Sequence, residues 1–455
     1  MKKLIRVASF ITSKYYKNYS EPSISFIYDE RYKVYYILKG NLSELWNIIL
    51  SKENYDDVFS YAYENNISDL LIELLVELKQ KEFIYIDKNF NFTGYKHLTA
   101  IVNESDTDSF NALYTGIAKI VNKYNLLNSV TLQLSYKCNL FCKHCFNPKN
   151  IDNYELSFEI AKKFIDEAYE LGMINLSFTG GECTCSKDFL KIAKYVREKH
   201  IFLTFLTNAQ LMFNDDYFDE IIRIYPYEIR TSIYSMNPDI HDYITGVKGS
   251  HAKTLHVMKK IREKNIKIVI NCPNLKPNKN HYIDVKKFAD SIGANMVYSS
   301  RFINNINNNN DFIKLSEDEV SEFYFNELKN GKPFRKEFKK CDRCLCSSTR
   351  LTHLCLTPNA NVTLCNDFDY SLGNYNSVSL KEIWETSMAN AVSTVTSNNL
   401  HDCFNYDYCR YCTYCPKLPM YDSEFMKKSE TICSDARAYY NALKKFESLN
   451  LIEYK

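Results

Sequence analysis

The first part of the chain alternates between strand-like and helix-like patterns of apolar residues. Residues 24–28 and 33–38 alternate apolar and polar positions, as the two strands of a hairpin do. Apolar residues then recur at helical spacing over three stretches, 42–50, 54–64 and 67–79, and we expect Ser68 to cap the third. With a closing strand at residues 83–86, this order predicts a small winged-helix domain over residues 1–90.

The pattern changes after a bridging segment, residues 91–127, in which we expect a helix near residues 106–124. Strand-like runs then alternate with helical runs, and the strands are predicted at 130–134, 174–178, 202–206, 229–233 and 266–271. Repeated strand–helix units predict an α/β fold with a parallel sheet, whose ligands collect at the carboxyl ends of the strands. The asparagine run at residues 304–310 is expected to be an exposed loop.

Charge and hydropathy exclude several kinds of partner. The 455 residues carry a formal net charge of +2, and residues 1–90 hold 12 Lys and Arg against 13 Asp and Glu, which argues against a phosphate-binding face. No apolar run reaches the length of a transmembrane helix, and the N-terminus lacks the pattern of a signal peptide. We therefore expect a cytoplasmic protein that binds neither nucleic acid nor a membrane.

Cysteine is the residue type that departs most from ordinary usage. The chain has 16 cysteines, which a reducing cytoplasm would keep from forming disulfides. Clustered cysteines in that setting indicate ligands of metal ions or iron–sulfur clusters. Ten of them lie between Cys341 and Cys433, whereas Cys272 stands alone and is expected to be a core thiol.

The cysteines of one loop, Cys138, Cys142 and Cys145, have the spacing C-x3-C-x2-C. Three thiolates can ligate three irons of a [4Fe–4S] cluster and leave the fourth iron open. S-adenosylmethionine (SAM) can chelate such an iron, and an electron from the cluster would then cleave it to an adenosyl radical. The spacing resembles the motif of the radical SAM superfamily at all three positions. A zinc site, or chance in a cysteine-rich chain, is the alternative.

A glycine pair followed by an acid comes directly after the second strand of this region. Gly180 and Gly181 would let the backbone approach a ligand closely, and Glu182 would meet a cationic amino group. These residues resemble the GGE motif by which the radical SAM family contacts the amino group of SAM, although Cys183 stands where the family usually has proline. An ordinary Gly-Gly turn is the alternative.

Weaker signals follow on later strands. Asn208 resembles the asparagine of the family's Thr-Asn-Gly pattern, and Ser232 matches a serine that the family places near the SAM ribose and carboxylate. His144 completes the candidate SAM-binding residues, His241 is expected to be mainly structural, and no catalytic side chain is assigned. The resemblance assigns residues 128–320 to the radical SAM core and implies a partial (β/α)6 barrel similar to a TIM barrel.

Residues 334–440 resemble a SPASM domain, an iron–sulfur appendage of many peptide-modifying radical SAM enzymes, with residues 441–455 as a tail. The resemblance implies two auxiliary [4Fe–4S] clusters. The candidate ligands are Cys346, Cys365, Cys403, Cys409, Cys412, Cys415 and Cys433, with Cys341, Cys344 and Cys355 also available. One or two zinc sites are the alternative, since closely paired cysteines suit zinc as well.

The order of elements in residues 1–90 resembles the RiPP recognition element, a winged helix that binds the leader of ribosomally made precursor peptides. The resemblance rests on generic core positions, residues 35–40, 44–46 and 74–86. A winged helix that binds DNA, or one that only packs, is the alternative.

The combined resemblances imply a maturase that abstracts hydrogen from a ribosomal precursor peptide with the adenosyl radical. Its product would be a Cys thioether crosslink of the sactipeptide or ranthipeptide type, and a flavodoxin or ferredoxin would be the reducing partner. Another radical modification, a C–C crosslink or epimerisation, is the runner-up. A zinc-binding winged-helix regulator is the rival of a different class.

Overall fold

The computed structural model of the chain divides into two internally packed units. The first unit is Met1–Asn128 with Tyr169–Leu176 and Lys191–Leu203, and the second is Ser129–Ala168 with Ser177–Leu190 and Thr204–Lys455. The structure describes residues 5–8, 11–16, 23–32, 34–52, 55–86, 121, 124, 126–145, 154–299, 314–335, 337, 352–366, 370–386, 403, 405–415 and 427–449. The asparagine run, and all but two residues of the helix expected near 106–124, lie outside this part of the chain.

A three-stranded antiparallel sheet opens the first unit. Its order is β2-β3-β4, formed by β2 (Ile11–Tyr16), β3 (Ile24–Asp29) and β4 (Val34–Lys39). The β3–β4 pair confirms the predicted hairpin. Strand β2 was not predicted, because Thr12, Ser13 and Lys14 are polar at three successive positions; all three are buried, at 1%, 1% and 4% exposure.

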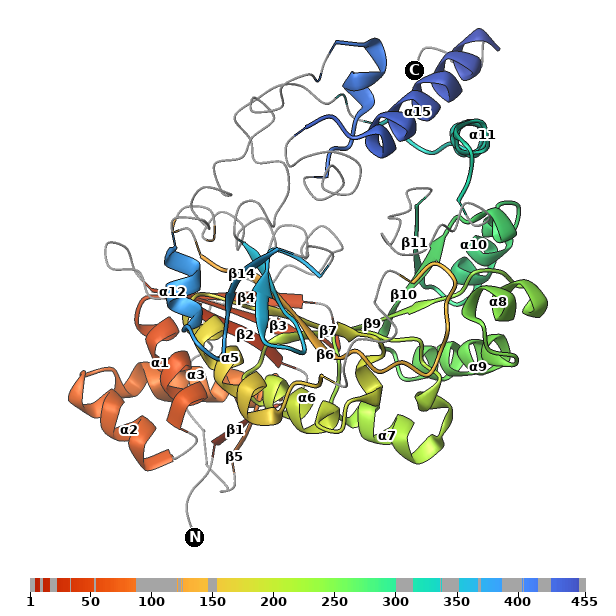
Figure 1. Ribbon diagram of the computed structural model, residues 1–455. Helices are drawn as coiled ribbons and strands as arrows, with labels where there is room; N and C mark the ends of the chain where they lie inside the picture. The colour runs from red at the N-terminus through yellow and green to blue at the C-terminus, as the bar shows by residue number, and fades with distance from the viewer. Residues whose placement is uncertain are drawn as a thin grey trace. The chain divides into compact units, whose positions relative to one another are not determined.

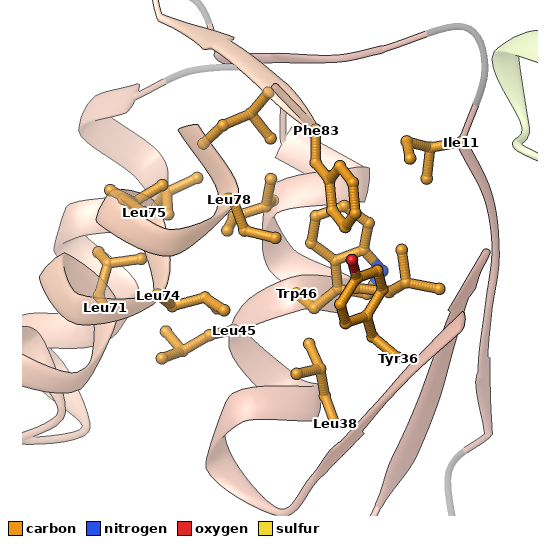
Figure 2. Close-up of a cluster of buried hydrophobic side chains, with 14 of the residues drawn as sticks. Ile11, Tyr36, Leu38, Leu45, Trp46, Leu71, Leu74, Leu75, Leu78 and Phe83 are labelled. Atoms are coloured by element: carbon orange, nitrogen blue, oxygen red, sulfur yellow. The ribbon is translucent and has the colours of Figure 1, made fainter. Parts of the chain in front are cut away.

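Three helices pack beside this sheet in the same unit: α1 (Asn41–Lys52), α2 (Tyr55–Glu64) and α3 (Ser68–Gln80). Their core is centred on Trp46, which is fully buried and lies among leucines of α3 together with Tyr36 and Phe83 (Figure 2). The expected cap at Ser68 is wrong: Ser68 is the first helical residue, and Ile67 precedes it with no side-chain cap. The closing strand β5 (Ile84–Ile86) pairs antiparallel with β1 (Ile5–Val7).

The outer edge of β2 is occupied by another segment of the same unit. The Ser13 N–H donates to the His200 carbonyl at 2.9 Å, and His200 Nδ1 donates to the Ile11 carbonyl at 3.0 Å. The Lys14 ammonium donates to the Tyr169 carbonyl at 2.6 Å. Within the described residues no strand pairs with the outer side of β4, so β4 is the open edge of this sheet.

A buried ion pair reinforces the same contact. Arg197, in α6 (Phe189–Glu198), lies 3.0 Å from a Glu30 carboxylate oxygen, and both side chains are less than 5% exposed. Arg197 Nη1 also donates to the Thr12 hydroxyl at 3.0 Å and to the Ile201 carbonyl at 2.7 Å. Because a buried charge is costly without its partner, this pair ties β2 and the turn after β3 to α6.

A nine-stranded sheet provides the barrel framework (Figure 1). Six of its strands follow one another in chain order: β6 (Ser129–Ser135), β7 (Asn175–Gly180), β8 (Phe202–Leu206), β9 (Glu228–Ser232), β10 (Lys267–Pro273) and β11 (Asn295–Ser299). The recorded pairs from β8 to β11 are all parallel. The intervening helices are α5 (Phe158–Glu170), α6, α7 (Asp215–Arg223), α8 (Pro238–Thr245), α9 (Ser250–Glu263) and α10 (Tyr282–Ser291). These elements confirm the predicted α/β fold class.

The remaining strands of this sheet come from the C-terminal part of the chain. Strand β12 (His353–Leu356) runs parallel to β6, and β13 (Asn361–Thr363) and β14 (Ser371–Asn374) add antiparallel strands beyond it. Helix α12 (Leu380–Glu385) follows, with Ser379 and Glu382 forming its capping box. The antiparallel extension makes the sheet mixed at this end.

Two long helices close the described part of the chain. Helix α11 (Glu317–Lys329) packs on α15 (Glu430–Ser448), where the Tyr324 hydroxyl donates to Asp435 at 2.5 Å and Arg437 pairs with Glu317 at 2.9 Å. At 19 residues, α15 is the longest of the described helices, and it carries charged side chains on several turns. No helix among the described residues has the length and apolar character needed to cross a membrane.

We expect Arg197→Ala to destabilise the first unit by about 3–5 kcal/mol, because it removes the cation that faces the buried Glu30 carboxylate. Urea unfolding can be followed through Trp46 fluorescence in a Trp384→Phe background, which leaves one tryptophan. Arg223→Ala, a change to an exposed arginine of α7, is the matched control and should cost less than about 0.5 kcal/mol. An Arg197→Ala curve that superimposes on that of the parent would contradict the assignment.

Candidate functional site

The cysteine loop, residues 138–145, follows the carboxyl end of β6 in the second unit. Cys138 is exposed, and Cys142 and Cys145 are partly buried. The loop backbone is held by the last turn of α8: the Phe141 N–H donates to the Thr245 carbonyl at 2.8 Å, and the Lys143 N–H donates to the Ile244 carbonyl at 2.9 Å. The thiols therefore project from a loop whose backbone is fixed by the fold.

The glycine turn, Gly180 and Gly181, packs directly on the residues that lead into the cysteine loop. A methyl group on Gly180 would lie 2.3 Å from the Ser135 carbonyl oxygen, and one on Gly181 would lie 2.4 Å from the Lys137 carbonyl oxygen. The Gly181 N–H donates to the Ser135 carbonyl at 2.8 Å. The close approach of the protein's own backbone therefore requires glycine at both positions, and the expected approach to a ligand stays a prediction.

Glu182 is almost completely buried, at 1% exposure, and its carboxylate joins three parts of the site. One oxygen accepts from the Thr184 N–H at 3.0 Å, from the Thr184 hydroxyl at 2.6 Å and from the Thr207 hydroxyl at 2.7 Å. The other accepts from the Asn208 N–H at 2.6 Å. The expected contact with an amino group stays a prediction; the structure adds that Glu182 ties the glycine turn to the end of β8.

Asn208 reaches the cysteine loop from the carboxyl end of β8. Its side-chain amide donates to Asn139 Oδ1 at 2.6 Å and lies 3.8 Å from the Cys138 sulfur. The next residue, Ala209, has a positive φ of 62°, the left-handed conformation that glycine adopts most easily. The Thr-Asn-Ala turn therefore keeps the backbone shape of a Thr-Asn-Gly turn and brings Asn208 beside Cys138.

Ser232 and His144, both candidate SAM contacts, meet at one tyrosine that no motif indicated. The Tyr234 hydroxyl lies 3.3 Å from His144 Nε2, the two rings are in edge contact at 5.0 Å, and Ser232 is close enough to influence the pKa of the same phenol. Burial raises the pKa of Tyr234 well above its usual value. Behind it, burial lowers the pKa of His241 to about 4, so this histidine is a neutral core group, as its expected structural role requires.

Two further thiols follow the glycine turn. Cys183 is fully buried, donates to the Leu206 carbonyl at 3.4 Å and has a pKa raised well above its usual value by burial. Burial also raises the pKa of Cys185 to about 12. Both are neutral thiols near neutral pH, which suits structural roles better than nucleophilic ones.

The C-terminal cysteines are described in part. Cys355 is buried on β12, Cys365 follows β13, and Cys433 lies in the first turn of α15. Cys433 is near enough to Cys403 and Cys409 for their charges to interact, and burial raises its pKa to about 11. Cys412 and Cys415 follow the short helix Asp407–Tyr411. Cys341, Cys344 and Cys346 lie outside the described residues.

The donor set of the cysteine loop fits an iron–sulfur cluster. In the described ranges, no three Cys, His, Asp or Glu side chains converge as the ligands of a single metal ion would. A [4Fe–4S] cluster makes a different demand, because each thiolate binds its own iron and the ligands stand apart across the cluster. Cys145 is close enough to Cys138 to influence its pKa, and Cys142 and Cys145 are both close enough to influence that of Tyr234. Three thiols of one short loop are thus a donor set that suits a cluster.

Comparison with protein families matches two parts of this chain. The radical SAM superfamily matches residues 132–289, and the SPASM iron–sulfur cluster-binding domain matches residues 344–416. The first match contains the cysteine loop and the glycine turn, and the second contains eight of the ten C-terminal cysteines, all except Cys341 and Cys433.

Three related proteins match different shares of this chain. A PqqA peptide cyclase of Bradyrhizobium diazoefficiens is 25% identical over 168 residues, which are 36% of this chain and 44% of the cyclase. The antilisterial bacteriocin subtilosin biosynthesis protein AlbA of Bacillus subtilis is 24% identical over 310 residues, 65% of this chain and 67% of AlbA. The structure of Streptococcus suis SuiB bound to its precursor peptide SuiA superposes with a TM-score of 0.56 at 13% identity, over 94% of this chain and 100% of SuiB.

The two family matches follow one another along the chain. A region that matches the radical SAM superfamily precedes a region that matches the SPASM domain. Radical SAM domains bind a [4Fe–4S] cluster and SAM, and SPASM domains bind further iron–sulfur clusters. The chain spans 44% of the length of the PqqA peptide cyclase it matches.

We expect Gly181→Ala to displace residues 136–137 and the cysteine loop, because the added methyl would lie 2.4 Å from a backbone carbonyl. After anaerobic reconstitution, iron and sulfide analysis should show the loss of one cluster relative to the parent. Gly331→Ala is the matched control, since no atom lies within 4 Å of its methyl. Unchanged iron and sulfide in Gly181→Ala would show that the turn does not shape the cluster site.

Proposed function

We propose that this chain is a radical SAM maturase that modifies a ribosomally made precursor peptide. The observation that carries the proposal is the arrangement at the carboxyl ends of β6 and β7, where the cysteine loop is locked to the glycine turn. The SPASM domain, and similarity to proteins named for peptide cyclisation and for the biosynthesis of a bacteriocin, support a peptide as the substrate class. In this proposal the domains keep their predicted bounds: a winged helix at residues 1–90, a bridging segment at 91–127, a radical SAM core at 128–320, a SPASM domain at 334–440 and a tail at 441–455.

The candidate site residues of the second unit have different roles in this proposal. Cys138, Cys142 and Cys145 would hold the cluster, and Asn208, beside Cys138, would orient the loop. Ser232, at the carboxyl end of β9, lies where the ligands of parallel sheets collect. When bound, the cluster and SAM would supply the adenosyl radical that abstracts hydrogen from carbon.

The C-terminal cysteines would hold two auxiliary clusters. The mutual influence of Cys403, Cys409 and Cys433 supports a shared cluster for these three residues. The other cluster would draw on Cys346, Cys365, Cys412 and Cys415. An auxiliary cluster could accept an electron, or bind a substrate thiolate before a C–S bond forms, which is why a Cys thioether is our first choice of product.

The first unit is the proposed docking site for the leader of the precursor. An extended peptide can add as a strand to an exposed sheet edge through backbone hydrogen bonds. Here the β2 edge is occupied by His200, which leaves β4 as the open edge within the described residues. We place the leader in a groove between β4 and α3, where β4 offers an edge on which a leader strand can pair.

The proposal also covers the type of product, the electron donor and the location of the protein. Similarity to peptide cyclases keeps a C–C crosslink as the second candidate outcome, alongside epimerisation. A flavodoxin or ferredoxin would deliver the electrons, and the cytoplasm is the proposed location, since it keeps the thiols reduced.

We expect Cys142→Ala to abolish the cleavage of SAM to 5′-deoxyadenosine, because two thiolates cannot hold the cluster with its open iron. Chromatography of the reaction after anaerobic reconstitution and reduction measures the product. Cys272→Ala is the matched control: it removes one fully buried thiol and should leave cleavage near the parent level. Cleavage at the parent rate by Cys142→Ala would refute the assignment of the cluster.

Leader binding should protect the backbone amides of β4 from hydrogen exchange, because strand addition supplies acceptors to its open edge. Exchange followed by mass spectrometry on the full chain, with the leader and with a scrambled leader, measures this. The amides of β2 are the internal control, and their exchange should not change, since their outer edge is already occupied. Protection confined to other segments would place leader recognition elsewhere.

A further inference from the structure

Tyr234 lies just beyond the carboxyl end of β9 and is fixed from several sides. Its side chain is 5% exposed and packs with Ile244 and Leu275. Its N–H donates to His241 Nδ1 at 3.3 Å, and its carbonyl accepts from the Asn278 amide at 2.7 Å. The phenol therefore extends from a backbone position that has little freedom to move.

The Tyr234 hydroxyl lies beside a group that the sequence placed near SAM. It lies 3.3 Å from His144 Nε2, and the two rings are in edge contact at 5.0 Å. A neutral phenol has one proton to donate, so the simplest pattern runs from the Tyr234 hydroxyl to His144 Nε2. This hydrogen bond links the segment after β9 to the cysteine loop.

The middle and the end of the cysteine loop are held differently. The middle is anchored by backbone bonds from Phe141 and Lys143 to the end of α8. At the end of the loop, the Cys145 N–H bonds within the loop, to the Cys142 carbonyl at 3.2 Å. The contact of His144 with Tyr234 ties this end of the loop to the barrel.

We propose that Tyr234 is a positioning residue of the radical SAM site, and that its hydroxyl fixes His144 and, through it, the placement of the neighbouring Cys145. The inference rests on the proposed function and adds a residue to it. Tyr234 does not itself have to touch SAM or the cluster; it sets the shape of the loop that does.

Tyr234→Phe tests the proposal, because it keeps the ring and removes the hydroxyl. Anaerobically reconstituted, reduced full-length protein is titrated with SAM, and the change in the electron paramagnetic resonance spectrum gives the affinity. We expect the cluster to be retained and the SAM affinity to fall roughly fivefold, the effect of one lost hydrogen bond of about 1 kcal/mol. Tyr375→Phe is the matched control, since it removes the 2.8 Å bond of a buried tyrosine hydroxyl to Glu167 and should leave the titration unchanged.

A double-mutant cycle separates positioning from general destabilisation. If Tyr234 acts through His144, then Tyr234→Phe should have little further effect in a His144→Phe background. Additive losses of SAM affinity, or a Tyr234→Phe titration equal to that of the parent, would overturn the inference. If Tyr234→Phe fails to fold, His144→Phe alone tests the same bond, and a titration equal to the parent again overturns it. A parent spectrum that does not respond to SAM would instead overturn the proposed function.

Discussion

The close contact between the glycine turn and the backbone before the cysteine loop is the constraint on which the rest of the site depends. Side chains at Gly180 and Gly181 would collide with the carbonyls of Ser135 and Lys137, so the end of β7 must lie directly on the end of β6. Glu182 then extends this contact to β8 through its bonds to Thr207 and Asn208. Three neighbouring strand ends are joined by backbone contacts and one buried carboxylate.

The opposite side of the cysteine loop is held by α8, so backbone hydrogen bonds, and not the thiols, fix the shape of the loop. The turn at β7 fixes the approach to Cys138, while the carbonyls of Ile244 and Thr245 fix the middle of the loop. Backbone groups provide these restraints, so the three sulfur atoms stay available for ligation. A site preorganised in this way loses little conformational freedom when its cofactors bind.

The sequence predicted the barrel strands and the cysteine loop well, because both depend on local patterns: apolar periodicity and short spacing. It failed where burial depends on distant partners. Strand β2 contains successive polar residues, and their burial depends on hydrogen bonds with three distant residues, His200, Arg197 and Tyr169. Tyr234 was missed for a similar reason, since it is one of 36 tyrosines and belongs to no motif until the fold places it beside His144.

The central claim is that the cysteine loop holds a [4Fe–4S] cluster with one iron open to SAM. Electron–nuclear double resonance on the reduced, anaerobically reconstituted chain tests it directly when SAM carries 15N in its amino group. The account predicts a hyperfine coupling between the cluster spin and this nitrogen, which is lost when SAM is omitted. A cluster signal without any 15N coupling, or protein that contains zinc and no sulfide, would contradict the account.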